Sequence, residues 1–272
     1  MAGAERQVHA AGVLHAELNP HGTFVIPTSD SKRVWQESFE EQIARQAYNT
    51  APVEALVRTV AYHLRAHCPP DRLGALHYLE RGCGAGSNLL WLAEKGITVS
   101  GVDIAPNALA LARDRFVHAG LGDRVGSLVE GSVDATPFPD ETFDGVIEAC
   151  VFQHLDRPAR QRAWAEVRRV LKKGGVFAGY MLDAGHSTFV AEQARQLPDD
   201  PGSLHLNDGS SKLHLTNIGL AHFFTRDELV DLFEGFSVID PCLTTYYLPK
   251  DEARRRGYDE YLQSMWTVYA VK

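Results

Sequence analysis

Two acidic residues and the glycine-rich segment that follows the first of them carry the clearest chemical signal in the sequence. Glu80 precedes glycines at alternate positions of residues 82–86, and Asp103 ends the next apolar run, residues 97–102. Closely spaced glycines let the backbone turn tightly and let a ligand approach at the positive end of the following helix. A carboxylate at the tip of the next strand can accept hydrogen bonds from both hydroxyls of a ribose. The segment therefore predicts a nucleoside site.

The spacing separates this segment from a dinucleotide site. A dinucleotide fingerprint reads G-x-G-x-x-G, and its third glycine lies one residue later than Gly86 does here. Glu80, just ahead of the glycines, would repel a pyrophosphate but suits an ammonium group. A ligand with a ribose at one end and a zwitterionic amino acid at the other satisfies both acids.

With these residues the chain resembles the class I S-adenosylmethionine-dependent methyltransferases, in which an acid precedes G-x-G-x-G and a second acid ends the next strand. The resemblance covers about residues 76–182 by motif and the C-terminal strands by pattern. It implies S-adenosyl-L-methionine as cofactor, S-adenosyl-L-homocysteine as product and a small molecule as acceptor. A glycine turn of some other α/β enzyme is the alternative.

The resemblance also implies which residues hold the cofactor. Glu80, the glycine turn and Glu148 would bind the methionine end, Asp103 the ribose, and residues 132–133 the adenine. The implied cofactor-binding residues are Tyr48, Glu80, Gly82, Cys83, Gly84, Gly86, Asp103, Ile104, Ser132, Val133 and Glu148.

Two positions depart from the family pattern. Ser132 replaces the acid at the adenine amine, and its hydroxyl accepts a hydrogen bond more weakly than a carboxylate does, although Asp134 could swing in. Arg81 replaces an apolar residue of the first motif. A charge there must find a carboxylate or solvent.

The catalytic candidates lie in residues 148–155 (EACVFQHL), which resemble the family's loop ending in L-H-H-L. This loop leaves the fourth predicted strand at its carboxyl end, where open α/β sheets bind ligands. Glu148 could hold the ammonium, stabilise a developing cation or take the acceptor's proton, and its alternative is a salt bridge to a cap arginine such as Arg58. His154 is the second candidate base, and its alternative is a structural histidine that caps the loop.

Residues 183–221 form too long a connection for a simple turn and indicate a lid over the acceptor site. The segment contains His186, His205 and His214, with His222 just beyond it, but their spacing is not that of metal ligands, so we predict no metal site. Aromatic residues of the cap and lid favour a partly apolar acceptor. The predicted acceptor contacts are Trp35, Phe152, His186 and Phe223, and for Trp35, Phe39 and Tyr62 a place in the core is the alternative.

Alternating strand and helix patterns from residue 76 to 182 predict a parallel sheet with right-handed crossovers. Together with the resemblance they predict a Rossmann-like, seven-stranded α/β methyltransferase sheet with an antiparallel last strand, an N-terminal helical cap and an inserted lid. The predicted organisation is a flexible N-terminal arm (1–30), a helical cap (31–70), a cofactor-binding α/β core (71–182), an acceptor-site lid and helix (183–235), and C-terminal strands that complete the sheet (236–272).

The composition limits which kinds of binding partner and which location we expect for the protein. The 272 residues have a formal net charge of −8 and no long basic run, which disfavours a nucleic acid. No apolar run is long enough to span a bilayer, no secretory signal is recognisable, and the four cysteines lie far apart, so we expect a cytoplasmic protein. The arm or the cap could pack on a second copy of the chain.

The predicted function is methyl transfer to the N, O or C atom of a small, partly apolar metabolite, in specialised metabolism. Two other functions stay open. The fold could be repurposed for elimination or cyclisation by Glu148 and His154, a hypothesis that rests mainly on Arg81, or it could be a non-catalytic nucleoside-binding or partner-binding module. A macromolecular acceptor is disfavoured by the negative charge and by a lid that implies an enclosed site.

Overall fold

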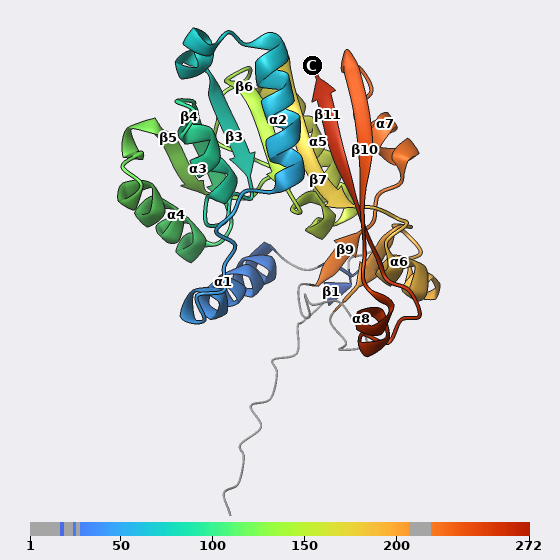
Figure 1. Cartoon of the computed structure of the whole chain (residues 1–272). Helices are drawn as coiled ribbons and strands as arrows, with labels where there is room; N and C mark the ends of the chain where they lie inside the picture. Colours follow the sequence, from blue (N-terminus) through green and yellow to red (C-terminus); the bar gives the residue numbers. More distant parts are fainter. Residues whose placement is uncertain (1–16, 19–23, 26–27, 207–218) are drawn as a thin grey trace, which may run out of the picture.

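A twisted seven-stranded sheet with the strand order β10-β11-β7-β6-β3-β4-β5 forms the centre of the molecule (Figure 1). The computed structural model describes residues 17–18, 24–25, 28–206 and 219–272. β11 runs antiparallel to both of its neighbours, and the strands from β7 to β5 are parallel to one another. The predicted α/β fold with an antiparallel last strand is confirmed. The strands are β3 (His77–Arg81), β4 (Thr98–Asp103), β5 (Val125–Glu130), β6 (Phe143–Ala149), β7 (Leu171–Leu182), β10 (Val238–Tyr247) and β11 (Leu262–Val271).

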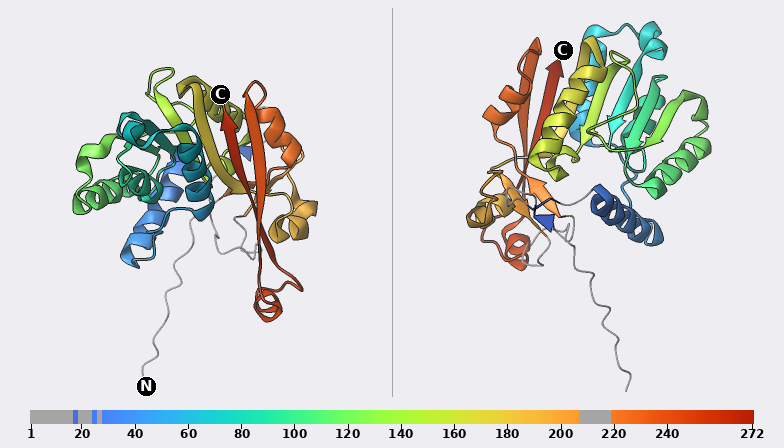
Figure 2. Two further views of the ribbon diagram at one scale, coloured as in Figure 1. Left: turned by 45° about the horizontal axis from the view of Figure 1, so that its top comes forward. Right: turned by 180° about the vertical axis from the view of Figure 1, so that it is seen from behind.

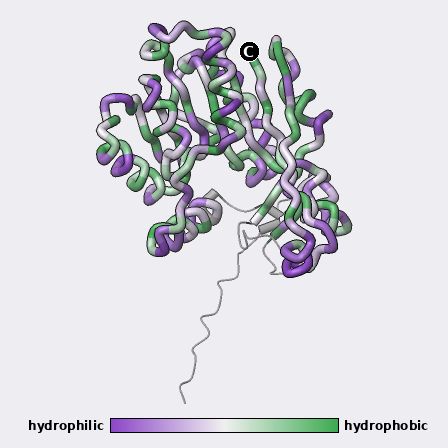
Figure 3. Tube along the Cα trace, viewed as in Figure 1, coloured by the Kyte–Doolittle hydropathy of each residue, from purple (hydrophilic) through white to green (hydrophobic). Residues whose placement is uncertain are grey.

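Helices cover both faces of the sheet (Figure 2). One face packs against the apolar sides of α2, α3 and α4, and the other against α5 and α7. Their bounds are α2 (Glu54–His67), α3 (Ser87–Ala93), α4 (Pro106–His118), α5 (Arg157–Val170) and α7 (Arg226–Leu232). Hydrophobic residues follow the central strands, whereas the small helix α8 (Lys250–Arg255) is hydrophilic (Figure 3).

Local signals in the sequence set where two of these helices begin. The Asp156 carboxylate accepts a hydrogen bond from the Ala159 N–H at 2.8 Å, so α5 starts three residues earlier than its apolar pattern alone indicates. The Thr225 hydroxyl accepts from the Glu228 N–H at 3.2 Å and caps α7, as its position ahead of an apolar run predicts.

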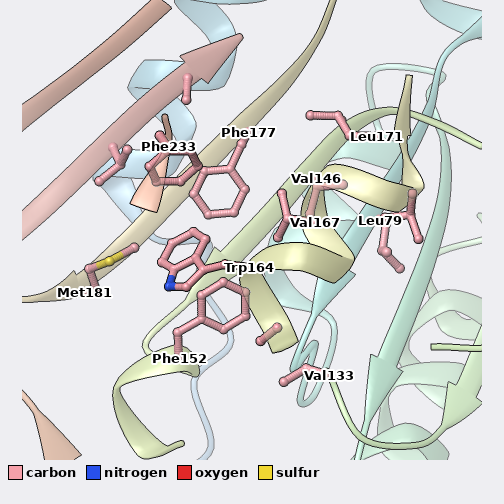
Figure 4. Packing of buried hydrophobic residues seen from close by; sticks show 14 of the residues in the cluster. Leu79, Val133, Val146, Phe152, Trp164, Val167, Leu171, Phe177, Met181 and Phe233 are labelled. Atoms are coloured by element: carbon pink, nitrogen blue, oxygen red, sulfur yellow. The ribbon is translucent and has the colours of Figure 1, made fainter. Parts of the chain in front are cut away.

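An aromatic column fills the space between the sheet and α5 (Figure 4). The Trp164 ring meets Phe152 and Phe233 edge to face, with ring centroids 4.6 Å and 4.7 Å apart, and Phe177 closes the column from β7. Edge-to-face pairs of this kind add to the free energy gained from burying the rings. The column holds α5, and with it the loop that contains Phe152, rigidly against the sheet.

The remaining elements gather at the carboxyl edge of the parallel strands (Figure 1). Helix α1 lies below that edge, whereas α2, the second helix of the predicted cap, packs on the sheet itself. The elements are β1 (Glu17–Leu18), β2 (Phe24–Val25), α1 (Thr28–Ala44), α6 (Ser187–Glu192), β8 (Ser203–His205) and β9 (Leu220–His222), with the short 3-10 turns η3 (Phe152–His154) and η4 (Gln193–Arg195). The 3-10 turns η1 (Pro70–Ala75) and η2 (Gly122–Arg124) lead into β3 and β5 at the opposite edge. Most of the predicted N-terminal arm, and His214 of the lid, lie outside the described residues.

No helix in the described part of the chain is long and apolar enough to cross a bilayer.

Candidate cofactor and acceptor site

The glycine turn leaves β3 and folds back onto the tip of β4. The Val102 carbonyl accepts hydrogen bonds from the N–H groups of Gly82 and Cys83, at 2.7 Å and 3.1 Å. Gly82 has a φ of +69°, and a Cβ at this position would lie 2.2 Å from Val151 Cγ2. Glycine is therefore required here both by the backbone conformation and by the close approach of the loop after β6.

Asp103 joins the turn to the next strand. Its two carboxylate oxygens accept hydrogen bonds from the backbone N–H groups of Gly84 and Ala105, at 2.7 Å and 2.9 Å. Burial raises the pKa of Asp103, and these backbone bonds oppose the rise. Each oxygen keeps a second lone pair, so the side chain can hold the turn and still accept from a ribose.

Glu80 is a buried carboxylate with an unused oxygen. The side chain is 2% exposed; Oε1 accepts from Asn88 Nδ2 at 2.6 Å, and Oε2 has no partner among the described residues. Burial raises the pKa of Glu80 to about 8, the Asn88 bond opposes this, and the nearby carboxylates of Asp103 and Glu148 raise it further. A cation bound here would satisfy the unused oxygen and lower that pKa.

Two polar residues that the sequence analysis did not single out organise this region. Asn88 donates to Glu80 and also accepts from the Val53 N–H at 2.8 Å, which links the start of α2 to the site. Arg115 donates to the Ala85 carbonyl at 2.7 Å and to the Thr50 carbonyl at 3.1 Å. Their sequence signal is a polar side chain on an otherwise apolar helix face next to the glycine turn.

Tyr48 and Cys83 lie on the two sides of the turn. The Arg115 guanidinium carbon is 5.8 Å from the centre of the half-buried Tyr48 ring, so the segment before α2 lies against the turn. Cys83 is buried beneath it, and burial raises the pKa of its thiol well above the usual value. The cysteine side chain is therefore a neutral packing group at neutral pH, and its backbone N–H donates to the Val102 carbonyl.

At the predicted adenine end, the Ser132 hydroxyl donates a hydrogen bond to Asp134. Asp134 is also held by Arg162, whose Nη2 lies 2.6 Å from its carboxylate. The Ser132 oxygen keeps lone pairs that can accept from an adenine amine, but Asp134 is already engaged. Val133 is buried and Ile104 is half-buried, which suits apolar contact with the faces of a flat ring.

Glu148 is fully buried at the end of β6. Its Oε2 accepts from the Val151 N–H at 2.9 Å, its Oε1 has no partner among the described residues, and burial raises its pKa to about 7. The alternative of a salt bridge to Arg58 is wrong, because Arg58 pairs with Glu54 at 2.8 Å on the exposed side of α2. Through Val151, which presses on Gly82, Glu148 shapes the glycine turn.

His154 connects the loop after β6 to the lid. Its Nδ1 lies 2.9 Å from the Leu220 carbonyl, an acceptor, so the proton sits on Nδ1 and Nε2 is left to accept from Gln153 Nε2 at 3.3 Å. Gln153 Oε1 accepts from the Leu182 N–H at 3.0 Å, which sets the orientation of the amide. Burial lowers the pKa of His154 to about 4. This arrangement favours the structural histidine.

Arg81 does not find the carboxylate or solvent that its charge was expected to require. The side chain is fully buried; Nη1 donates to the Ala163 carbonyl at 2.6 Å, and the guanidinium carbon lies 4.9 Å from the centre of the Phe152 ring. Nε and Nη2 have no partner among the described residues. Burial lowers the pKa of Arg81, and Glu166 and Glu148 oppose the change. Because neighbouring strand residues alternate faces, the guanidinium lies on the α5 face, opposite Glu80.

Helix α1 contributes two aromatic rings to the site. Trp35 lies edge-on to His154 with ring centroids 5.2 Å apart, and a Cβ on Gly84 would lie 3.1 Å from the Phe39 ring. Both rings are half-buried, whereas Tyr62 is 59% exposed, so the core alternative is wrong for Tyr62. Helix α1 therefore covers both the glycine turn and the loop after β6.

The other predicted acceptor contacts are more deeply buried. Phe152 has no exposed surface and belongs to the aromatic column, so the structure does not support it as an acceptor contact. His186 is 2% exposed, accepts from the Thr188 N–H at 3.2 Å as the cap of α6, and packs near Phe223. Burial lowers the pKa of His186 to about 4. His186 and Phe223 thus form the interior of the lid rather than its surface.

The described residues contain no group of three or more His, Cys, Asp and Glu side chains placed to hold a metal ion.

The site as a whole fits a cationic nucleoside. Asp103 lies close enough to Glu80 to raise the pKa of Glu80, and among the described residues neither acid has a cationic partner. The ammonium and sulfonium of S-adenosylmethionine would supply the missing positive charge, while Asp103 keeps acceptors for the ribose hydroxyls. The residues present therefore suit this cofactor.

Comparison with known proteins agrees with this geometry. Residues 79–179 match the family model described as a methyltransferase domain. A malonyl-[acyl-carrier protein] O-methyltransferase of Serratia marcescens is 30% identical over 210 residues, which cover 75% of this chain and 73% of that protein. A sterol 24-C-methyltransferase of Gibberella zeae is 28% identical over 87% of this chain, which spans 60% of the relative's length. A sterol 4-C-methyltransferase of Caenorhabditis elegans is covered over only 31% of its length.

Among solved structures, a SAM-dependent methyltransferase of Methanosarcina mazei has a TM-score of 0.57 and 26% identity, over 72% of this chain and 92% of that one. The family, fold and cofactor predictions are confirmed by these matches. The chain belongs to the class I S-adenosylmethionine-dependent methyltransferases.

Proposed function

We propose that this protein transfers a methyl group from S-adenosyl-L-methionine to a small, partly apolar metabolite of specialised metabolism. The observation that carries the proposal is Glu80, a buried carboxylate with an unused oxygen beside a second carboxylate, Asp103. An unpaired buried carboxylate costs stability, and a cationic ligand offsets that cost. A fold of this family with such a site is suited to bind and use its cofactor.

Each of four residues then has its own part in binding or catalysis. Glu80 binds the ammonium directly, and Asp103 binds the ribose. Glu148 holds Val151 against the glycine turn and so keeps the methionine end in place. His154 ties the lid to the loop after β6. We retain Glu148, whose pKa of about 7 suits proton transfer, as the residue that would accept the acceptor's proton.

The bound cofactor supplies an electrophilic methyl carbon. The protein's contribution is to align a nucleophile with that carbon and to exclude water, which is catalysis by proximity in an enclosed site. Helix α1 and the strand β9 cover the carboxyl edge on two sides, and Trp35 and His154 meet between them. In this arrangement the two elements would enclose an acceptor bound at this edge.

The lid interior supports an acceptor with apolar surface. A buried cluster in the lid includes Phe189, Phe223 and Met265, and Cys150 and Tyr180 pack against it from the ends of β6 and β7. Two of the relatives named above are sterol methyltransferases, and these names support an apolar acceptor for this chain as well. We further propose a cytoplasmic location, and helix α1 as the surface for any self-association.

Binding and transfer can be tested separately. Isothermal titration calorimetry should show S-adenosyl-L-methionine and S-adenosyl-L-homocysteine binding to wild type, with affinity at least tenfold weaker in Asp103→Asn. Asp123→Asn, at the exposed turn η2 ahead of β5, is the matched control and should bind as wild type does. Methyl-labelled cofactor incubated with the protein and extracts of the source cell should then label a small molecule.

Absence of cofactor binding by wild type would overturn the proposal and favour the repurposed fold. Binding without label transfer, together with turnover of the extract to an unmethylated product, would favour elimination or cyclisation. Label recovered only in protein or nucleic acid would exclude a small-molecule acceptor.

A further inference from the structure

The amino edge of the sheet, opposite the cofactor site, contains a cavity of about 570 Å³. Its lining comes from the last turn of α2, the starts of β3, β6 and β7, and the end of β11. None of these residues takes part in the site described above. The cavity is therefore a separate feature of the fold.

A buried hydroxyl faces this cavity. Tyr78 is 1% exposed and lines the cavity, and its ring lies over Gly145, where a Cβ would be 2.1 Å from Tyr78 Cε1. Burial raises the pKa of the Tyr78 hydroxyl, and Asp144, Cys68 and Tyr269, which line the same cavity, raise it further. The hydroxyl forms no hydrogen bond with a described residue.

The polar groups around Tyr78 are satisfied. His63 Nδ1 lies 2.9 Å from the Tyr269 hydroxyl. Asp144 accepts from Lys172 at 2.9 Å and from the His77 N–H at 2.9 Å. The Tyr78 hydroxyl, in contrast, keeps its donor and acceptor capacity for a molecule bound in the cavity.

The cavity combines apolar walls with positive charge. Leu64, Leu76 and Val271 provide apolar surface. The charged lining residues are Arg72, Lys172, Lys173 and Asp144, three cations against one anion, on a chain whose net charge is −8. Arg72 and Lys173 have no carboxylate partner within the part of the chain that the structure describes. The rim therefore attracts an anion.

We propose that this cavity binds a small amphipathic anion: an aromatic or otherwise apolar body carrying a phosphate or carboxylate group. The apolar body lies between Leu64, Leu76 and Val271, the anionic group lies near Arg72 and Lys173, and a polar atom of the ligand meets the Tyr78 hydroxyl. The site is independent of the acceptor site and lies at the other end of the strands.

Calorimetry on the full chain with three probes tests this. Phenyl phosphate carries both features, benzyl alcohol has the ring without the charge, and inorganic phosphate has the charge without the ring. Wild type should bind phenyl phosphate saturably and at least tenfold more tightly than either partial probe. Tyr78→Phe should weaken binding about fivefold. The double variant Arg72→Gln and Lys173→Gln should weaken it about tenfold and flatten its salt dependence.

Exposed cations outside the cavity serve as the control. Arg65→Gln with Lys95→Gln removes the same charge and should change phenyl phosphate binding less than twofold. Tyr78→Phe should melt at the wild-type temperature or above it, because the lost hydroxyl has no partner. Equal binding of all three probes, absence of phenyl phosphate binding, or unchanged binding in both the Tyr78 and the Arg72 and Lys173 variants would each overturn the proposal.

Discussion

Two buried glutamates of the same chain have opposite titration behaviour. Glu166 on α5 is 8% exposed, and burial alone would raise its pKa; Arg169 and Thr136 hydrogen-bond to it and lower the pKa to about 2. Glu80 on β3 is 2% exposed, receives one amide hydrogen bond, and has a pKa of about 8. Both side chains have little exposed surface, but Glu80 lies deeper and receives fewer hydrogen bonds, and both differences act to raise its pKa relative to that of Glu166.

The difference separates a structural carboxylate from a binding one. Glu166 receives two nitrogens of Arg169 at 2.6 Å and 2.8 Å and the Thr136 N–H at 2.9 Å, so its charge is already compensated. Glu80 has an oxygen left over and no cation. A fold that can pair one buried acid this completely leaves the other unpaired at the position where the cofactor's positive charge would lie.

Glu80→Gln should show the largest effect. The variant keeps the shape and the Asn88 contact but removes the charge, and loss of one partner of a buried charge pair costs about 2 kcal/mol or more. We expect the affinity for S-adenosyl-L-methionine to fall about 50-fold by calorimetry. Equal affinity in wild type and variant would show that Glu80 does not meet the cofactor's charge.

Glu166→Gln should have the opposite effect to Glu80→Gln, a loss of stability without a loss of cofactor affinity. Loss of a carboxylate with charge-assisted hydrogen bonds should lower the free energy of unfolding by about 2 kcal/mol at pH 7, measured by urea denaturation, with cofactor affinity unchanged. A carboxyl whose pKa is depressed on folding stabilises above its unfolded pKa of about 4.5. The difference between wild type and variant should therefore shrink as the pH falls from 4.5 towards 2. A cofactor-binding defect in Glu166→Gln would contradict the assignment of Glu166 as a structural carboxylate.

The pH dependence of cofactor binding is a further test of the contrast between Glu80 and Glu166. Below pH 8 the Glu80 carboxyl of the free protein is mostly protonated, whereas the cationic cofactor binds the ionised form. Binding therefore releases a proton, and the affinity for S-adenosyl-L-methionine should rise about tenfold from pH 6.5 to pH 8. The stability of the free protein should fall over pH 4.5 to 8, because the folded state holds a proton that the unfolded state has lost. Glu80→Gln should flatten both profiles relative to wild type. Parallel profiles in the two proteins would contradict the raised pKa.

Arg81→Met should have the smallest effect. The guanidinium is buried with one backbone hydrogen bond and an aromatic ring but no ion pair, and such a charge can often be replaced by an apolar chain without loss. We expect the free energy of unfolding to change by less than about 1 kcal/mol and the cofactor affinity by less than threefold. A large loss of affinity would mean that Arg81 acts on the site through Glu148, its neighbour on β6.

The local features of the site could be predicted from the sequence because they depend on chain neighbours. Alternating glycines after an apolar run require a tight turn, and Asp103 follows from the end of the next run, so the turn and its acid are found without tertiary information. The same holds for the Thr225 cap of α7 and for the α/β order of the core. Asn88 and Arg115 were missed because their partners, Val53 and Thr50, are brought to them only by folding.

The burial of individual side chains and the partners of charged residues could not be predicted from the sequence. Phe152 and Trp35 are both aromatic residues in segments near the site, yet one lies in the aromatic column and the other faces His154. Arg58 and Glu148 are complementary in type, but Arg58 has a partner one helical turn away. Spacing along the chain does not reveal which face of a sheet a loop residue joins.

The sequence by itself thus determined the family, the sheet and the two acids of the proposed cofactor site, because those depend on short segments whose conformation is set locally. The tertiary structure alone decided which acids are paired, which aromatics are exposed and where Tyr78 points. Pairing depends on distances between elements remote in sequence, and a carboxylate's pKa follows from those distances rather than from its residue type.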